Sequence, residues 1–358
     1  MICTPRILHR VTGARQLVQS FRSRSEMERK LNGEKTDEKH ILFDDDDIVI
    51  VNHGTAELWD QMRSLIRSMP WTTQDEATWQ LLPEQTNVHP CFAIRKSDGA
   101  FLGGSAIIET DIFYGAYYAV QPGLRGMGFG MKMTLQGMAV VLKALGKKPF
   151  LGRAVKEMLE KYEGPPLNAV PLNELYSFTL SRDALLRLFT STGSSFTPKS
   201  LKDMNEQQFD KVCEYDAFVV GRNRRTFLKD FHSLFFTKGV ALLDANGDVH
   251  GLVSSVPTLC NRHLIKIGPI FAENRDDACY LIKCIVEQFT QPEVRFVIHI
   301  TTGAAGDWIL EKCRDAGVPL HMGAVTICAT NKNNAMYKDP CKTEYMYAPM
   351  NCPLYFDR

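Results

Sequence analysis

Residues 117–131 read Tyr117-Tyr118-Ala119-Val120-Gln121-Pro122-Gly123-Leu124-Arg125-Gly126-Met127-Gly128-Phe129-Gly130-Met131. An apolar, β-prone run breaks at Pro122, passes through Arg125 and three alternating glycines, and enters a segment with helical periodicity. This pattern predicts a strand, an anion-binding loop and a helix. Glycines let backbone N–H groups approach a ligand closely, and the N-terminus of a helix adds partial positive charge. A diphosphate fits such a loop, and an arginine side chain there is a bidentate donor for phosphate oxygens.

The same glycines allow two other interpretations. A dinucleotide-binding fingerprint also places glycines between a strand and a helix. Here, however, Gly130 follows Gly128 by two residues instead of three. We also find no acidic residue about twenty positions on at the end of a following strand, where a dinucleotide site would have one. The second alternative is a glycine-rich turn that only starts a helix.

The arrangement Arg125-x-x-Gly128-x-Gly130, after a strand that ends in Val120-x-Pro122, closely resembles the acyl-CoA loop of the GNAT acetyltransferase superfamily. The resemblance implies that the loop amides hold the pyrophosphate of acetyl-CoA. It also implies that a bulge splays the preceding strand, so that its backbone pairs with the pantetheine arm. The cofactor-binding residues implied in this way are Tyr118, Ala119, Val120, Arg125, Gly126, Met127, Gly128, Phe129, Gly130 and Met131.

Length and composition are typical of a globular protein. The chain has 358 residues and 44% apolar residues, which suggests two domains or one large one. Its net charge of +1 gives no basic excess to attract nucleic acid or an anionic membrane. No apolar run approaches the 18 or so residues of a membrane helix. The ten cysteines form no C-x-x-C pair and no cluster at metal-ligand spacing. We therefore expect reduced core thiols and no metal site.

The N-terminal region differs in composition from the rest. Residues 1–30 carry five arginines among apolar residues and serines, with no acidic residue before Glu26, as in a mitochondrial presequence. A disordered basic tail of a cytoplasmic protein is the alternative, so both the mitochondrial matrix and the cytoplasm remain open. Residues 31–46 are polar and end in an acidic run, which indicates a solvated linker.

From residue 47 the pattern becomes domain-like. A short strand at 48–51 precedes a helix that Thr55 can cap, and strands at 91–95 and 101–108 are joined by a hairpin signal at Ser97-Asp98-Gly99. A strand at 112–120 leads into the glycine loop, and a helical stripe, a strand at 150–155 and a short helix at 156–163 follow. This is the GNAT order of elements, over residues 47–185. The stretch 190–200 is rich in serine and glycine, and we place the domain boundary there.

The second half faintly repeats the first. Asn246-Gly247 with Gly251 matches Asp98-Gly99 with Gly103, and each pair is followed by two strands and a helix. The expected glycine loop is replaced by 267–274, where Pro269 removes a donor amide and Glu273 repels phosphate, so we expect no acyl-CoA there.

The second half also resembles a GNAT subfamily that carries D-x-x-V-x-G-x-x-R and I-G-P in a degenerate second domain. The matching residues are Asp216, Val219, Gly221 and Arg224 for the first motif and Gly268-Pro269 for the second.

We therefore expect an α/β (α+β) fold of two tandem GNAT-like domains, each a mixed, mostly antiparallel sheet with flanking helices. The ranges are 1–46 for the extension and linker, 47–190 for the acetyltransferase domain and 200–356 for the degenerate domain.

Acyl transfer needs a neutral amine, a stabilised oxyanion and a proton for the leaving thiolate. Amides near 119–121 would polarise the thioester.

The catalytic residues follow partly from the resemblance. Tyr162 lies where the family often places a tyrosine that protonates the thiolate, although the usual Gly-Phe after it is missing. Glu109 is the candidate base, because burial at a strand end could raise its pKa; a solvated carboxylate is the alternative. Asp216, Arg222 and Arg224 could face the acceptor, or they could form an interdomain salt bridge.

The predicted function is acyl-CoA-dependent N-acyl transfer, with acetyl-CoA as co-substrate and a small-molecule primary amine as acceptor in preference to protein lysine. The alternative is a non-catalytic acyl-CoA-binding sensor or interaction module. The sequence does not indicate the oligomeric state.

Overall fold

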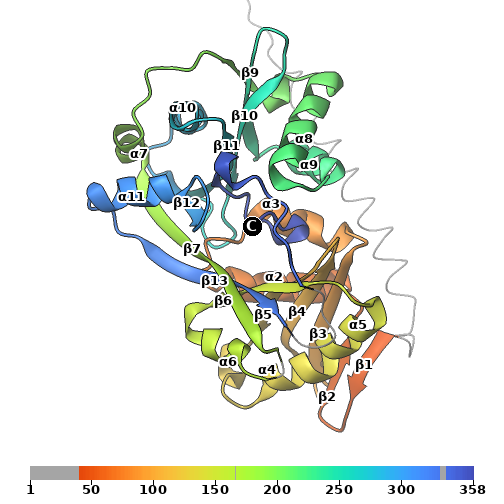
Figure 1. The fold of residues 1–358 in the computed structure, drawn as a ribbon. Coiled ribbons are helices and arrows are strands. Elements are labelled where there is room, and N and C mark those ends of the chain that lie inside the picture. Colours follow the sequence, from red (N-terminus) through yellow and green to blue (C-terminus); the bar gives the residue numbers. More distant parts are fainter. Residues whose placement is uncertain (1–39, 166, 331–335) are drawn as a thin grey trace, which may run out of the picture.

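The computed structural model describes residues 40–165, 167–330 and 336–358 (Figure 1). The predicted presequence, residues 1–30, lies outside these ranges and stays a prediction. Within the described residues, a mixed sheet of 14 strands runs through the whole molecule. Its pairings are antiparallel except for β5 with β6 and β11 with β12. The predicted fold class, two mostly antiparallel GNAT-like sheets with flanking helices, is confirmed.

The first half contains seven strands and most of the helices that the sequence predicts. Thr55 accepts a hydrogen bond from the Leu58 amide and caps α2, an arrangement that stabilises a helix by about 1 kcal/mol. The elements are β1 (Ile41–Asp44), β2 (Ile48–Val51), α2 (Ala56–Arg67), α3 (Glu76–Leu81), β3 (Val88–Arg95), β4 (Phe101–Glu109), β5 (Phe113–Val120), α4 (Phe129–Lys132), α5 (Ala139–Leu145), β6 (Phe150–Val155), α6 (Leu159–Glu163), β7 (Ala169–Ser181) and α7 (Arg182–Leu188). A π-helical stretch, Met133–Met138, joins α4 to α5 into one helical segment.

The second half repeats this order with one strand in place of two at its start and with β14 in place of a helix at its end. A side chain–backbone capping box formed by Asn205 and Gln208 starts α8. The elements are β8 (Thr197–Ser200), α8 (Glu206–Val220), α9 (Arg225–Ser233), β9 (Lys238–Leu243), β10 (Val249–Pro257), β11 (Leu264–Ala272), α10 (Arg275–Val286), β12 (Arg295–Thr301), α11 (Asp307–Asp315), β13 (His321–Ala329) and β14 (Met346–Ala348).

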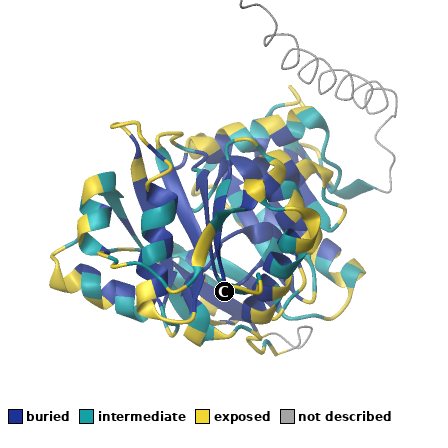
Figure 2. Ribbon diagram, turned by 90° about the horizontal axis from the view of Figure 1, so that it is seen from above, coloured by how far each residue is buried: buried dark blue, intermediate teal, exposed yellow. Residues whose placement is uncertain are grey.

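Helices cover both faces of the first half. The side chain of Phe92 on β3 belongs to the core cluster under α2, whereas Cys91 and Ala93 belong to the cluster that contains Met133. Because successive residues of a strand point to opposite faces, α2 and the segment 129–145 lie on opposite sides of the sheet. Figure 2 shows buried residues along the strands and exposed residues on the outer faces of the helices.

The two halves exchange a strand. The sheet order is β1-β2-β3-β4-β5-β6-β13-β7-β12-β11-β10-β9-β8. Strand β13, from the end of the second half, lies between β6 and β7 of the first half. Strand β7 in turn lies between β12 and β13. Each half therefore completes its sheet with a strand from the other.

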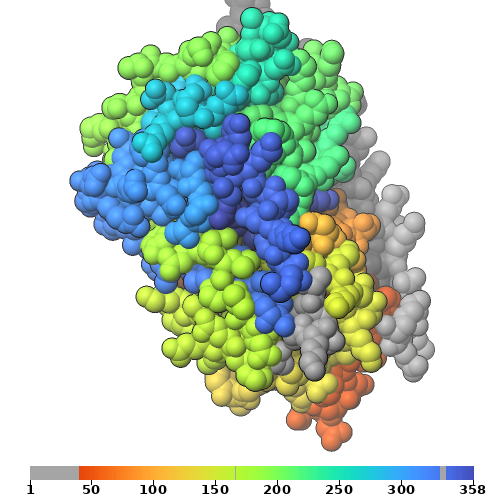
Figure 3. All heavy atoms as spheres, viewed as in Figure 1, coloured from red at the N-terminus to blue at the C-terminus, as the bar shows by residue number. Residues whose placement is uncertain are grey.

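The C-terminal segment 349–358 also connects the halves. The ring of Phe356 stacks on Tyr114 of β5, with 5.0 Å between ring centroids. Arg153 of β6 donates a hydrogen bond to the backbone oxygen of Arg358. One hydrophobic core cluster accordingly contains side chains from both halves and from this segment. Figure 3 shows the C-terminal residues between the two halves on the molecular surface.

The structure corrects two predicted linkers. In the stretch 31–46, residues Ile41–Asp44 form β1 and pair with β2. In the stretch 190–200, residues Thr197–Ser200 form β8 and pair with β9. Both stretches look polar because each forms an outer strand of the sheet, with one unpaired edge. The predicted boundary, 190–200, covers the irregular chain after α7 and also includes β8.

Candidate functional site

The strand before the glycine loop carries a bulge. Gly104 of β4 is opposite Ala119 and Ala106 is opposite Ala116, so two residues of β5 face one residue of β4 at this point. Tyr117 takes up the extra length with a φ of 58°, which is uncommon for a residue other than glycine. The bulge that the resemblance implies is therefore present.

Beyond the bulge, β5 separates from β6. The parallel pairing joins only Phe113–Gly115 to Phe150–Gly152, whereas β13 pairs with the whole of β6 along its other edge. The amide of Gln121 donates to the oxygen of Leu102 on β4. Since alternate residues of a strand direct their N–H groups to opposite edges, the Val120 amide points to the open edge. Of the amides expected at 119–121 to polarise a thioester, this one faces the open edge.

The loop itself is shaped by two glycines. Gly126 and Gly128 have φ values of 82° and 75°, and a Cβ built on either would meet no protein atom within 4 Å. The side chain of Met127 between them is 73% exposed. The inner surface of the loop is thus bare backbone that faces open space, as a phosphate-binding loop requires.

Gly130 has a different role from the other two. A Cβ at this position would overlap the hydroxyl of Tyr118. The hydroxyl of Thr134, one turn further along the helix, donates to the same tyrosine oxygen at 3.3 Å. The absence of a side chain at Gly130 lets the helix that follows the loop lie directly against β5.

Arg125 is used to hold the loop in place. Its Nε donates to the Val120 oxygen at 3.1 Å, and its Nη2 lies 3.3 Å from the sulfur of Met69. The positive charge of Arg125 therefore lies beside the loop, but its Nε already donates to the backbone. A contact between Arg125 and phosphate stays a prediction.

A pocket of about 930 Å³ begins at the loop. Gln121 and Phe101 form one side, and the polar face of α2, including Glu57, Gln61 and Ser64, forms the other. No residue of β6 lines it. The pocket therefore lies beside the position where β5 and β6 diverge and does not include it.

Tyr162 of α6 and Tyr118 of β5 lie close to each other. Tyr162 packs on Ala154 of β6 and on residues of β13, while Tyr118 packs against the helix after the loop. Burial, with a smaller contribution from the nearby Tyr118, raises the pKa of Tyr162 to about 12. The Tyr162 hydroxyl therefore stays protonated at neutral pH, next to the divergence of the two strands.

Glu109 does not have the expected environment. Lys148 donates to its carboxylate at 2.8 Å, and His89 lies 3.2 Å away. The hydrogen bond from Lys148 lowers the pKa of Glu109 and outweighs its burial. The expectation that burial raises this pKa is wrong, because the sequence did not reveal the two partners. A carboxylate held in this way is a poor base, since a base works best with a pKa near the operating pH.

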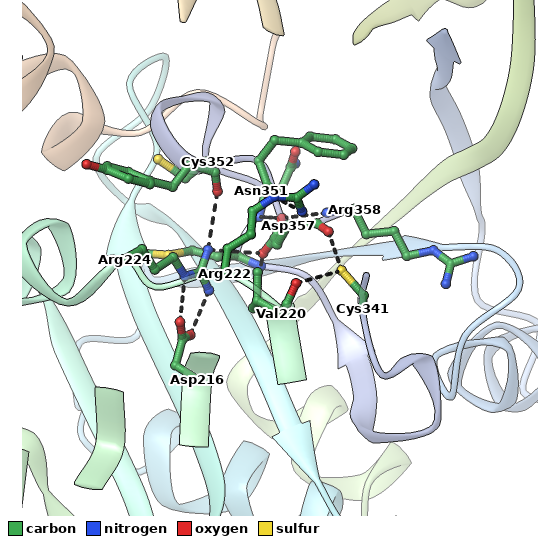
Figure 4. A network of polar contacts seen from close by, with 12 residues as sticks. Asp216, Val220, Arg222, Arg224, Cys341, Asn351, Cys352, Asp357 and Arg358 are labelled. Carbon is green, nitrogen blue, oxygen red and sulfur yellow. Dashed lines mark hydrogen bonds and ion pairs between the residues drawn. The ribbon is translucent and has the colours of Figure 1, made fainter. Parts of the chain in front are cut away.

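Asp216 and Arg224 form a buried ion pair (Figure 4). The guanidinium donates two hydrogen bonds of 2.7 Å to the carboxylate. Both side chains are fully buried, and the carboxylate of Asp357 lies 3.6 Å from Arg224. Both residues belong to the second half, so this pair is neither the acceptor contact nor the interdomain salt bridge that the sequence left open. It leaves neither side chain facing a cleft.

Arg222 joins the two halves of the molecule. Its Nε lies 2.8 Å and 2.9 Å from the carboxylate oxygens of Asp111, in the turn between β4 and β5. The same guanidinium donates to the Phe356 oxygen at 3.3 Å. This is the interdomain salt bridge expected as the alternative to a substrate contact, formed by a different arginine and acid from the buried pair.

The second half has the corresponding site, but the chain itself occupies it. Strand β11 leaves β12 after Ile267, as β5 leaves β6. The free edge of β11 then pairs with β14, Ile270 with Ala348 and Phe271 with Met346. A pantetheine arm would have to pair with this edge. The prediction that the second half binds no acyl-CoA thus gains a physical reason.

Sequence reasoning missed β14 and the C-terminal segment. Met346-Tyr347-Ala348 is too short to be recognised as a strand. The stacking of Phe356 on Tyr114 joins residues that lie far apart in the sequence. The one usable signal would have been that β11 and β12 diverge as β5 and β6 do. A second divergence leaves a free strand edge, which a later segment of the chain could pair with.

Other kinds of site find no support in the described part of the chain. We find no group of three or more histidine, cysteine or acidic side chains that could hold a metal ion in residues 40–165, 167–330 and 336–358. The nine cysteines in these ranges are free thiols. None of the helices described is long and apolar enough to cross a membrane.

Comparison with known proteins identifies the fold. Residues 212–319 match the family model "Acetyltransferase (GNAT) domain". An uncharacterized protein of Caenorhabditis elegans is 24% identical over 74% of this chain and 84% of its own length.

Two solved structures are similar in fold. A proposed acetyltransferase from Pyrococcus horikoshii superposes with a TM-score of 0.60, 13% identity and coverage of 86% of this chain and 95% of its own. A tandem GNAT protein from the clavulanic acid biosynthesis pathway gives a TM-score of 0.60, 13% identity and coverage of 79% and 97%.

Proposed function

This chain is a tandem GNAT protein in fold, with a GNAT domain recognisable in its second half, and on this premise we propose that it is an acyl-CoA-dependent N-acyltransferase. The reaction is transfer of acetyl from acetyl-CoA to a primary amine by direct attack. The observation that carries the proposal is the bare glycine loop beside an unpaired strand edge. These two features occur together only in the first half of the described chain.

The residues present fit the co-substrate. Open space inside Gly126 and Gly128 accommodates phosphate oxygens against backbone amides. The open edge of β5 offers the Val120 amide to a thioester carbonyl, where charge develops during attack. When bound, acetyl-CoA supplies an activated acyl group and a thiolate leaving group.

The chain can provide the proton that the leaving group needs. As the nitrogen–carbon bond forms and the carbon–sulfur bond breaks, the thiolate takes the proton of the Tyr162 hydroxyl, and solvent returns it. A pKa of about 12 keeps this hydroxyl protonated until it is needed. The amine releases its own proton to solvent, because Glu109 is engaged by Lys148 and His89.

A small-molecule primary amine is the proposed acceptor, in preference to protein lysine. The net charge of +1 gives no strong field that would attract a basic or acidic polypeptide. Acidic groups in the pocket beside the loop, Glu57 among them, suit an amine that arrives as an ammonium ion.

The second candidate function is acyl-CoA binding without turnover. It is favoured by one observation, the ion-paired state of Glu109, which leaves no assigned base. A panel of amines with detection of free thiol separates the two functions, since only the transferase releases thiol in an amine-dependent way.

The loop is tested with a matched pair of substitutions at Gly128. Asparagine and aspartate both tolerate the left-handed conformation that this position requires. They differ in charge alone. We expect Gly128→Asp to weaken acetyl-CoA binding about 100-fold, since it places a carboxylate against the diphosphate. Calorimetric titration of the full chain measures this.

In the same titration, Gly128→Asn is expected to keep the affinity within about threefold, a change below 1 kcal/mol. Equal affinities for the two variants would show that no diphosphate lies at this loop, and the proposed function would fail with it.

A further inference from the structure

A second pocket lies in the half of the molecule that has lost the glycine loop. Its volume is about 360 Å³, within the usual range for small-molecule sites. One wall comes from α8, one from the start of β10, one from the end of β11 and one from the residue before β14. The lining residues are Lys211, Glu214, Tyr215, Phe218, Asp248, Val249, His250, Glu273 and Tyr345.

This pocket corresponds to the pocket beside the glycine loop. Gly103 pairs with Val120 in the first half, and Gly251 pairs with Ala272 in the second. The next residues along the second strands, Gln121 and Glu273, are therefore equivalent, and each lines its pocket. The two halves thus keep a pocket at the same place with different chemistry.

Carboxylates line this pocket, as Glu57 and Asp60 line the first one. Glu273 stands where the first half has a neutral amide, with a carboxylate oxygen 2.7 Å from Nδ1 of His250, and Glu214 adds a second carboxylate. The third carboxylate, Asp248, is matched by Lys211, whose Nζ donates to it at 2.7 Å. Such a lining repels phosphate and attracts a cation.

Aromatic rings form the rest of the wall. Phe218 lies 6.4 Å from Tyr215 and 5.4 Å from Tyr345, between ring centroids, and its side chain is 44% exposed. The ammonium group of Lys342 already lies 3.6 Å from the centre of the Phe218 ring. The ring therefore accepts an ammonium ion in this environment. Aromatic faces with nearby carboxylates are the usual recognition site for organic ammonium ions.

We propose that this pocket binds a small organic cation, an alkylammonium or quaternary ammonium compound. Figure 1 places α8 and β10 at one end of the molecule and α4 at the other, so the ligand is separate from the acyl-transfer site. The inference goes beyond the proposed function and does not depend on it.

The test uses choline and its neutral isostere 3,3-dimethylbutan-1-ol as probes, with putrescine as a primary diamine. Calorimetric or NMR titration of the full chain, without acetyl-CoA, measures each affinity. We expect choline or putrescine to bind and the neutral isostere to bind at least tenfold more weakly. Equal binding of choline and the isostere overturns the proposal, and so does the absence of binding by both cations at 10 mM.

Three substitutions locate the site. Glu273→Gln, which keeps the shape and removes the charge, is expected to weaken cation binding about tenfold. Phe218→Ala is expected to weaken it about two- to fivefold, the usual size of an exposed cation–π contact. Glu293→Gln is the control, since this exposed acid lies outside the pocket. Cation affinities that are the same in Glu273→Gln and Glu293→Gln would place the ligand elsewhere.

Lys342→Gln has the opposite expected sign. Removing the ammonium that lies on the Phe218 ring frees that face for the ligand, so binding should tighten about two- to fivefold. Weaker binding in this variant contradicts the proposed competition between Lys342 and the ligand for one aromatic face.

Discussion

The Tyr162 hydroxyl is the residue-scale feature whose role in catalysis is open to direct test. We expect Tyr162→Phe to lower kcat by about 100-fold, in the range typical of a lost general acid, while the affinity for acetyl-CoA stays the same. Because burial raises the Tyr162 pKa to about 12, this residue stays protonated up to pH ~10. Its deprotonation should therefore not lower the wild-type rate below that pH. Steady-state kinetics from pH 6 to 10 check both. An unchanged kcat in the variant would make Tyr162 a packing residue.

Single residues were placed well along the chain and less well in their surroundings. Spacing alone located the loop glycines, and the positive φ values of Gly126 and Gly128 agree with that interpretation. The spacing of residues could not show that the Arg125 side chain donates to the Val120 oxygen, or that Lys148 pairs with Glu109. Partners of a charged side chain depend on contacts across the fold, which a sequence pattern does not contain.

At the scale of elements, regular strands with clear turns were predicted closely, and unusual ones were missed. The hairpin at Ser97-Asp98-Gly99 and the strand Phe150–Val155 are where the pattern placed them. Strand β7 was not recognised, because Pro171 lies inside it and proline normally excludes a paired strand. The structure accommodates this proline at a shift of register opposite Ile327, before the pairing with β12 begins.

Docking of the helix after the loop onto β5 gives the element-scale prediction. A Cβ at Gly130 would overlap the Tyr118 hydroxyl, so Gly130→Ala should push the helix away and destabilise the protein by about 1–3 kcal/mol, as overpacking does. Gly123→Ala is the control, since a Cβ there meets no atom within 4 Å, and its effect should stay within about 0.5 kcal/mol. Denaturant unfolding measures both, and equal stabilities would mean that the helix does not depend on this close approach.

The arrangement of the whole molecule was the least accessible from sequence. The faint repeat correctly indicated two similar units in tandem, and the composition of 190–200 indicated a junction. Neither could reveal that β7 and β13 each complete the sheet of the other half. An exchanged strand has the same hydrophobic pattern as one that stays in its own unit, because both are buried on the same faces.

The exchange leads to the prediction for the whole molecule. Residues 40–192 alone would contain β7 without β12 or β13 beside it, and residues 193–358 alone would have β12 and β13 without β7 between them. Unpaired strand edges of this kind promote aggregation. We therefore expect each fragment to be insoluble or unfolded when expressed alone, and the two fragments to form a soluble, folded complex when co-expressed. The complex should also keep the interhalf contact between Arg222 and Asp111. Size-exclusion chromatography and circular dichroism distinguish these states, and two fragments that each fold as stable monomers would show that the exchanged strands are dispensable.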